Sequence, residues 1–152
     1  MNFRKIICWQ PLLGGIGAGI TIVILAYITF QSFLSGSIYG LWLATSFGST
    51  VVLVFGYPDN EFAQPKNVLF GHLLCALTGI LFVTLFKISQ DRSIFFLAIG
   101  LAVGIAVMLM MALKITHPPA GGNTILVMLA QDSFQYLIFP IMVGAITIII
   151  GG

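Results

Sequence analysis

The feature that most constrains this chain is the length of its uncharged stretches. Lys, Arg, Asp and Glu make up 7% of its 152 residues, and none of them occurs between residues 6 and 58. Four further uncharged stretches of 17 residues or more cover 67–86, 93–113, 115–131 and 133–152. A helix that crosses a bilayer needs about 17–25 mostly apolar residues, whereas a soluble domain carries about 25% charged residues. The sequence therefore predicts a protein that crosses the membrane several times.

Turn-forming and charged residues divide the chain into six apolar segments. We expect these segments at 12–34, 39–56, 68–86, 94–113, 121–130 and 134–152. The fifth has only about ten residues, or about 15 Å of helix, half the thickness of the hydrocarbon layer. The second contains small and hydroxylated residues near its middle, at 45–50. We predict an all-α polytopic membrane protein, a helix bundle of about six segments in which the second and the fifth are short or broken.

Two patterns recur along the chain. Residues 48–53 match residues 122–127 without a gap, and a Gly-xxx-Gly-Ile pattern at 15–20 returns at 100–105. Three segments per copy would make the second copy enter from the opposite face, as in the 3+3 inverted repeats of secondary transporters. The copies would cover residues 12–86 and 94–152 of a single transmembrane domain, residues 1–152. A chance match between glycine-rich stretches is the alternative.

The basic residues favour a cytoplasmic N-terminus. In that orientation four of them lie inside and two outside, in agreement with the excess of positive charge on cytoplasmic loops: Arg4, Lys5, Lys66 and Lys114 inside, Lys87 and Arg92 outside. The first apolar run is longer than the core of a signal peptide, so we expect it to remain as a span. We expect the protein in the inner (cytoplasmic) membrane of a bacterium.

Residues 117–124, His-Pro-Pro-Ala-Gly-Gly-Asn-Thr, carry the most informative local pattern. The prolines prevent a helix across them and favour extended backbone at Thr116 and His117. Gly121 and Gly122 allow a close backbone approach, and the apolar run that follows can begin a new helix. The N-terminus of such a helix attracts a small anion. A kinked helix with a cluster of packing glycines is the alternative interpretation.

The corresponding place in the first half is the hydroxylated stretch 45–50. Ser46 or Ser49 can cap a helix that begins there, and their hydroxyls can face a solute. Two converging helix N-termini would form a polar pocket without formal charge, which suits a monovalent anion that must bind and then leave. We predict substrate contacts from Ser46, Gly48, Ser49, Thr50, His117, Pro119, Gly121, Gly122, Asn123 and Thr124.

His72 and His117 are the only histidines. Ionisable residues within a membrane are functional candidates, and either side chain can carry a proton or act in gating. A histidine that simply bonds to a neighbour is the alternative for both. Because no paired cysteines or carboxylates accompany them, we expect no metal site, no cofactor and no enzyme activity. The basic residues are scattered singly, which excludes a nucleic-acid surface. Glycine-rich faces are compatible with a homodimer.

The segment His117-Pro118-Pro119-Ala120-Gly121 resembles the signature of the HPP family of small integral membrane proteins. A second stretch is also similar to that family: 48–55, Pro58, 63–67 and Gly71-His72. The resemblance implies a bundle that is usually described with four spans. Members in cyanobacteria and chloroplasts are described as nitrite transporters. We therefore expect transport of a small monovalent anion, with nitrite as the best single candidate. The alternatives are a structural or regulatory membrane subunit without transport, and a carrier of another small polar solute.

Overall fold

The computed structural model describes residues 9–31, 38–85, 92–131 and 134–152, and within these ranges it contains helices and no strand. The helices are α1 (Trp9–Gln31), α2 (Ile38–Gly56), α3 (Pro65–Leu85), α4 (Arg92–Ala112), α5 (Gly121–Ala130) and α6 (Val143–Gly151). Shorter helical turns are η2 (Glu61–Ala63), η3 (Pro118–Ala120) and η4 (Leu137–Met142). The predicted all-α fold is confirmed.

Three of the described helices are long and apolar enough to cross a membrane. The stretches are Pro11–Thr29 in α1, Pro65–Leu85 in α3 and Ile94–Ala112 in α4. Large apolar side chains are exposed along the outer faces of these helices, such as Val23, which is 69% exposed. The chain is an integral membrane protein. Its orientation stays a prediction, since Arg4, Lys5 and Lys87 lie outside the described residues.

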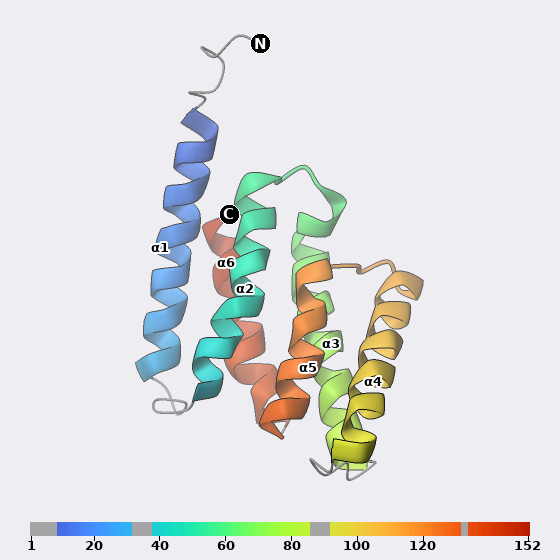
Figure 1. Cartoon of the computed structure of the whole chain (residues 1–152). Helices are drawn as coiled ribbons and strands as arrows, with labels where there is room; N and C mark the ends of the chain where they lie inside the picture. Colours follow the sequence, from blue (N-terminus) through green and yellow to red (C-terminus); the bar gives the residue numbers. More distant parts are fainter. Residues whose placement is uncertain (1–8, 32–37, 86–91, 132–133) are drawn as a thin grey trace.

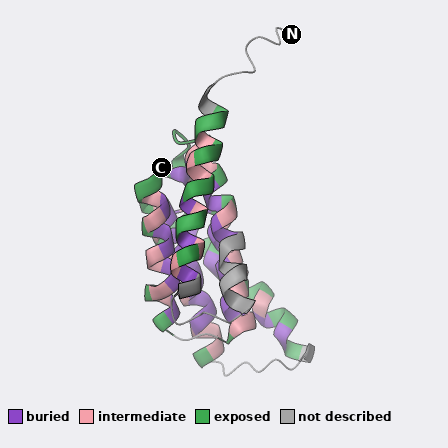
Figure 2. Cartoon of the chain, turned by 90° about the vertical axis from the view of Figure 1, so that its left-hand side faces the viewer, coloured by how far each residue is buried: buried purple, intermediate pink, exposed green. Residues whose placement is uncertain are grey.

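The bundle is built around α3, which packs against α4, α5 and α6 (Figure 1). Helix α5 lies between α2, α3 and α4, while α1 lies on the far side against α2 and α6. Figure 2, seen from the side of α1, shows mostly exposed positions on this helix and buried positions behind it. The interior of the bundle is therefore formed by α2, α3, α5 and α6, and these helices position the candidate site.

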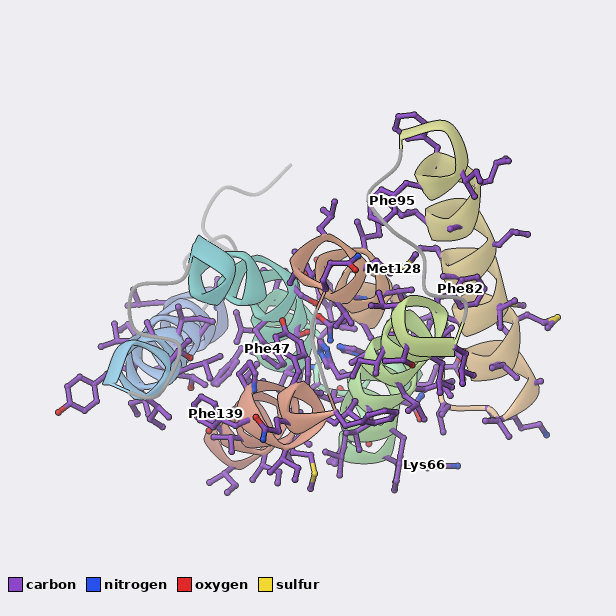
Figure 3. All side chains as sticks on the ribbon, turned by 90° about the horizontal axis from the view of Figure 1, so that it is seen from below. Phe47, Lys66, Phe82, Phe95, Met128 and Phe139 are labelled. Carbon is purple, nitrogen blue, oxygen red and sulfur yellow. The ribbon has the colours of Figure 1, made fainter. Side chains whose placement is uncertain are left out.

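Aromatic side chains fill the interior at two places, labelled in Figure 3. Phe47 of α2 lies in the main core, where Gly144 of α6 leaves the space that its ring occupies. Phe82, Phe95 and Met128 join α3, α4 and α5 in a second cluster. The main core joins α2, α3, α5 and α6, and the second cluster joins α3, α4 and α5.

The glycines of the two Gly-xxx-Gly patterns face outward. A Cβ placed on Gly15, Gly19, Gly100 or Gly104 would meet no atom of the described chain within 4 Å. These glycines therefore do not bring two helices of this chain together. The glycines that do so are others, Gly71 and Gly79 of α3 among them.

The structure corrects one expectation about broken helices. Helix α2 runs without interruption through residues 45–50, so no helix begins at Ser46 or Ser49, and the predicted helix N-terminus there is wrong. The hydroxyls of Ser49 and Thr50 lie 3.0 and 3.1 Å from the backbone oxygen of Ser46, a local bond that a helix tolerates. Small polar residues therefore did not end the helix.

The fifth segment is a half-length helix, as predicted, with ten residues in α5. The other irregular segment is the sixth rather than the second. There Phe139 has extended backbone (φ −128°, ψ 120°) before Pro140, which has no backbone N–H to donate. The inverted repeat is not confirmed, because α2 is continuous where α5 follows a loop and a 3₁₀ turn.

Candidate functional site

The loop between α4 and α5 carries His117 into the bundle. Helix α4 ends because Lys114 has a left-handed conformation (φ 53°) and Ile115 N–H donates to the Met110 oxygen at 3.0 Å. His117 is extended (φ −136°, ψ 95°), as a residue before proline should be. The 3₁₀ turn η3 follows, and α5 begins at Gly121. The extended backbone predicted at His117 and the new helix after the glycines are confirmed, while the two prolines themselves lie in a 3₁₀ turn.

The start of α3 fastens this loop to the loop after α2. The Asn67 amide donates to the Glu61 oxygen at 2.9 Å and to the Thr116 oxygen at 3.1 Å. One turn further along, Gly71 allows an unusually close approach. A Cβ at Gly71 would lie 2.8 Å from the Cβ of His117. The imidazole of His117 is thus held between α3 and the interior face of α2.

Four polar side chains from three helices and this loop form one hydrogen-bonded cluster. Thr50 Oγ1 lies 2.9 Å from His72 Nε2 and 3.0 Å from His117 Nε2. The amide nitrogen of Asn123 lies 2.6 Å from His72 Nδ1. All four residues have 0% of their surface exposed. We call Thr50, His72, His117 and Asn123 the histidine cluster.

The partners of the cluster determine which ring nitrogens carry protons when both imidazoles are neutral. His117 Nδ1 lies 2.7 Å from the Phe62 carbonyl oxygen, which can only accept, so His117 carries its proton on Nδ1. Its Nε2 must then accept from the Thr50 hydroxyl. The Thr50 oxygen in turn accepts from Nε2–H of His72, whose Nδ1 accepts from the Asn123 amide. The hydrogen bonds thus run in one direction, from Asn123 to Phe62.

The surroundings of the cluster are apolar. The ring of Phe47 lies against that of His72, with centroids 4.6 Å apart, and the two imidazole centroids are 5.0 Å apart. Burial lowers the pKa of His117 below its ordinary value, and the bond to the Phe62 carbonyl opposes this only in part. The neutral arrangement of the cluster is therefore the one expected near neutral pH.

A groove opens beside the cluster, between α2 and α5. Its volume is about 460 Å³, and it is lined by Ser46, Ser49, Pro119, Gly122, Ile125, Leu126 and Leu129. Ser46 connects groove and cluster, because its hydroxyl donates to the Pro119 oxygen at 2.9 Å and its carbonyl oxygen lies 3.1 Å from Thr50 Oγ1. Among the described residues around the groove none is charged.

The predicted site residues divide into three sets. Thr50, His117 and Asn123 lie in the cluster with His72, and Ser46, Ser49, Pro119 and Gly122 line the groove. The remaining three are placed elsewhere: Gly48, Gly121 and Thr124. A Cβ on either glycine would meet nothing within 4 Å, and Thr124 Oγ1 donates to the Cys75 oxygen of α3 at 2.9 Å.

Three contributors to the site were missed in the sequence. Gly71 and Asn67 belong to the stretch 63–72, to which only the family resemblance had pointed. The Phe62 carbonyl is a backbone atom, which no side-chain pattern can indicate. These three contributors hold the loop that carries His117 against η2 and the start of α3.

The rest of the described chain contains weaker candidates for a binding site. No group of three His, Cys, Asp or Glu side chains that could hold a metal ion occurs in residues 9–31, 38–85, 92–131 and 134–152. A second hollow of about 470 Å³ lies between α1 and α2, lined by Gly14, Gly15, Phe55 and Tyr57 among others. None of the side chains that line it forms a hydrogen bond with the histidine cluster. The groove beside Ser46 is therefore the stronger candidate.

Known proteins similar to this chain match it over most of its length. Residues 4–152 match the family model described as HPP, transmembrane region. Two transmembrane proteins of Dictyostelium discoideum are each 30% identical to this chain, over 133 and 115 residues. These alignments cover 85% and 72% of this chain but only 45% and 36% of the relatives, so the chain spans less than half of their length. No solved structure matches.

Proposed function

This chain belongs to the HPP family of transmembrane proteins, and from that premise we propose that it transports a small monovalent anion, with nitrite as the best single candidate. The observation that carries the proposal is the groove lined by the Ser46 and Ser49 hydroxyls at the start of α5. A helix N-terminus favours negative charge, and each serine hydroxyl can turn toward an anion from the backbone oxygen it bonds in the structure, Pro119 for Ser46 and Ser46 for Ser49.

The absence of charge in the described lining supports an anion that is bound weakly. Ser46, Ser49 and Gly122 offer hydrogen bonds and close backbone approach without a fixed cation. A buried lysine or arginine would hold a monovalent anion more firmly and slow its release. Nitrite has three atoms, and the groove of about 460 Å³ leaves room for it together with water. The same donors would also accept another small polar solute, which the experiment below tests.

We assign the predicted residues different roles within this carrier. Ser46, Ser49, Pro119 and Gly122 contact the anion, while Thr50, His117 and Asn123 lie behind them and control proton position. Gly48, Gly121 and Thr124 act through the shape and position of α2 and α5. The carrier makes and breaks no covalent bond and uses no cofactor. We place it in the inner membrane of a bacterium, with the N-terminus in the cytoplasm, as a homodimer that binds no nucleic acid.

The test is reconstitution of the purified protein in liposomes, with uptake of nitrite compared with nitrate, formate and chloride. We expect saturable nitrite uptake above that of protein-free vesicles. Ser49→Ala should reduce the flux several-fold, whereas Thr147→Val on α6, which loses only a bond to the Val143 oxygen, should not. Folded protein that moves none of these anions would contradict the proposal and favour a structural or regulatory subunit.

A further inference from the structure

The histidine cluster has two further acceptor atoms beside the bonds of its neutral arrangement. In that arrangement each donor between Asn123 and Phe62 points toward the next acceptor, and the Phe62 carbonyl ends the series. The backbone oxygen of Ser46 accepts from the Ser49 hydroxyl and also lies 3.1 Å from Thr50 Oγ1, next to His117. Oδ1 of Asn123, next to His72, is buried without a hydrogen-bond partner among the described residues.

The Ser46 oxygen accommodates a proton on His117. It lies 3.1 Å from Thr50 Oγ1, and Thr50 can turn its hydroxyl toward it. When His117 Nε2 is protonated, this nitrogen donates to Thr50 instead of accepting from it. The Thr50 oxygen then accepts from both imidazoles and donates to Ser46, which is the full capacity of a hydroxyl. No group of the cluster loses a partner.

The Asn123 oxygen accommodates a proton on His72. Asn123 Oδ1 is buried and has no hydrogen-bond partner among the described residues. A half-turn of the amide exchanges Oδ1 with the nitrogen that lies 2.6 Å from His72 Nδ1. A proton on Nδ1 would then meet an acceptor. The half-turn gives Oδ1 a donor, and it places the amide N–H groups where Oδ1 lay, a position without a partner among the described residues.

We propose that the histidine cluster is a binding site for one proton, and that this proton crosses the membrane together with the anion. The inference rests on the proposed transport function and specifies its coupling ion. One proton per monovalent anion moves no net charge. The carrier is therefore an electroneutral symporter, driven by the pH gradient and not by the membrane potential.

The proton can pass between the histidines through Thr50, and the transfer reverses the direction of the two Thr50 hydrogen bonds. A proton binds His72 Nδ1 as the Asn123 amide turns. The Nε2 proton of His72 moves to Thr50 Oγ1, while the hydroxyl proton of Thr50 moves to His117 Nε2. The positive charge has then moved from His72 to His117, and Thr50 is again a neutral hydroxyl. The reverse sequence returns it.

The described residues around the cluster provide no counter-charge for the resulting imidazolium. The described side chains of α2, α5 and α6 include no titratable group, and Cys75 of α3 bonds through its thiol to Met110 of α4. Asp59 and Glu61 at η2, Lys66 of α3 and Lys114 after α4 are exposed, and Tyr136 before η4 is buried in the main core. An anion in the groove beside Ser46 would supply the missing negative charge, so anion and proton each favour the binding of the other.

The decisive experiment imposes a pH gradient on proteoliposomes and follows nitrite. With the outside one pH unit more acidic, a one-to-one symporter should accumulate nitrite about tenfold. A potassium diffusion potential set with valinomycin should leave this accumulation unchanged. Protein-free vesicles measure the leak of nitrous acid. Thr50→Val should abolish the protein-dependent accumulation, Thr50→Ser should restore it, and Thr84→Val, which loses only a bond within α3, should behave as wild type.

Each outcome separates the coupling from the transport. Saturable nitrite flux that ignores the pH gradient would overturn the proton site and leave the transport function standing. A complete lack of flux would overturn the transport function instead. In that case, or if Thr50→Val fails to fold, ¹⁵N NMR of the histidines decides the proton site. One proton bound by the pair between pH 8 and pH 5 supports the site, and unchanged imidazoles overturn it.

Discussion

The Cβ of His117 lies directly against Gly71, at a distance that leaves no room for a methyl group on α3. This contact sets how far the loop after α4 enters the bundle. It brings the imidazole within 3.0 Å of Thr50 on the opposite helix. The two stretches that resemble the HPP family, around residues 63–72 and 117–121, thus meet at this point. Their joint presence reflects one packing arrangement.

Gly71→Ala should therefore displace His117. An added Cβ would lie 2.8 Å from the His117 Cβ and 3.3 Å from the Ile115 oxygen, so the loop must move. We expect a loss of about 1–3 kcal/mol in stability, typical of overpacking, and a strong loss of nitrite flux. Thermal unfolding in detergent measures the first effect. Gly104→Ala on α4 is the matched control, since its Cβ meets nothing; equal stability of the two variants would contradict this reasoning.

The two histidines should carry their protons on different nitrogens. The Phe62 carbonyl requires Nδ1–H on His117, and the resulting direction of the bonds requires Nε2–H on His72. Since the chain has only two histidines, ¹⁵N NMR of histidine-labelled protein at pH 8 should show one signal set of each tautomer. His72→Gln should remove the Nε2–H set. Two identical tautomers would show that the bonds run differently.

Filling the groove should stop transport without unfolding the protein. A side chain on Gly122 would point toward the Ser46 hydroxyl, which lies 3.9 Å from the position of its Cβ. We expect Gly122→Leu to reduce nitrite flux at least tenfold. Gly15→Leu, which projects into the other hollow, should retain most of the activity. Equal flux through both variants would place the anion elsewhere.

Proton uptake by the cluster should occur at a pH below the ordinary pKa of histidine. Burial disfavours the charged form and lowers the pKa of His117, so a lower pH is needed to protonate it. We expect nitrite uptake, corrected for leak, to keep rising as the external pH falls below about 6.5. Initial rates between pH 7.5 and pH 5 provide the measurement. A maximum of the uptake rate at pH 7 or above would contradict a proton site whose pKa is lowered by burial.

Thr124→Val should affect stability more than transport. Thr124 Oγ1 donates to the Cys75 oxygen and so joins α5 to α3, away from the cluster. Loss of this bond should cost about 1 kcal/mol. The flux should fall less than with Thr50→Val, measured on equal amounts of folded protein. A greater loss of flux from Thr124→Val would return this residue to the anion site.

The sequence predicted the backbone of the site better than its partners. The proline pair at 118–119 and the glycines after it correctly indicated extended backbone and a new helix, because these residues restrict φ and ψ directly. The expected break at 45–50 is wrong, since small polar residues only weaken a helix, and the Ser49 hydroxyl donates to the Ser46 oxygen within it. The break in the sixth segment occurs at Pro140, which lacks a backbone N–H.

The contacts of the site depended on tertiary structure. Thr50 and Asn123 were predicted as site residues, but alignment of residues 48–53 with 122–127 paired Thr50 with Thr124. The structure instead joins Thr50 to Asn123 through His72, because α2 and α5 present different faces to α3. The role of the Phe62 carbonyl depends on where a loop folds, which no local pattern encodes.

The assembly of the cluster from distant segments has a consequence for biosynthesis. When the ribosome has produced α1 to α3, Thr50 and His72 are already in the membrane, but the residues that complete their hydrogen bonds, His117 and Asn123, have not yet been made. Thr50 and His72 can bond to each other within the N-terminal half, but His72 Nδ1 has no partner until Asn123 has been made. A chain truncated before residue 114 should be a substrate for membrane quality-control proteases.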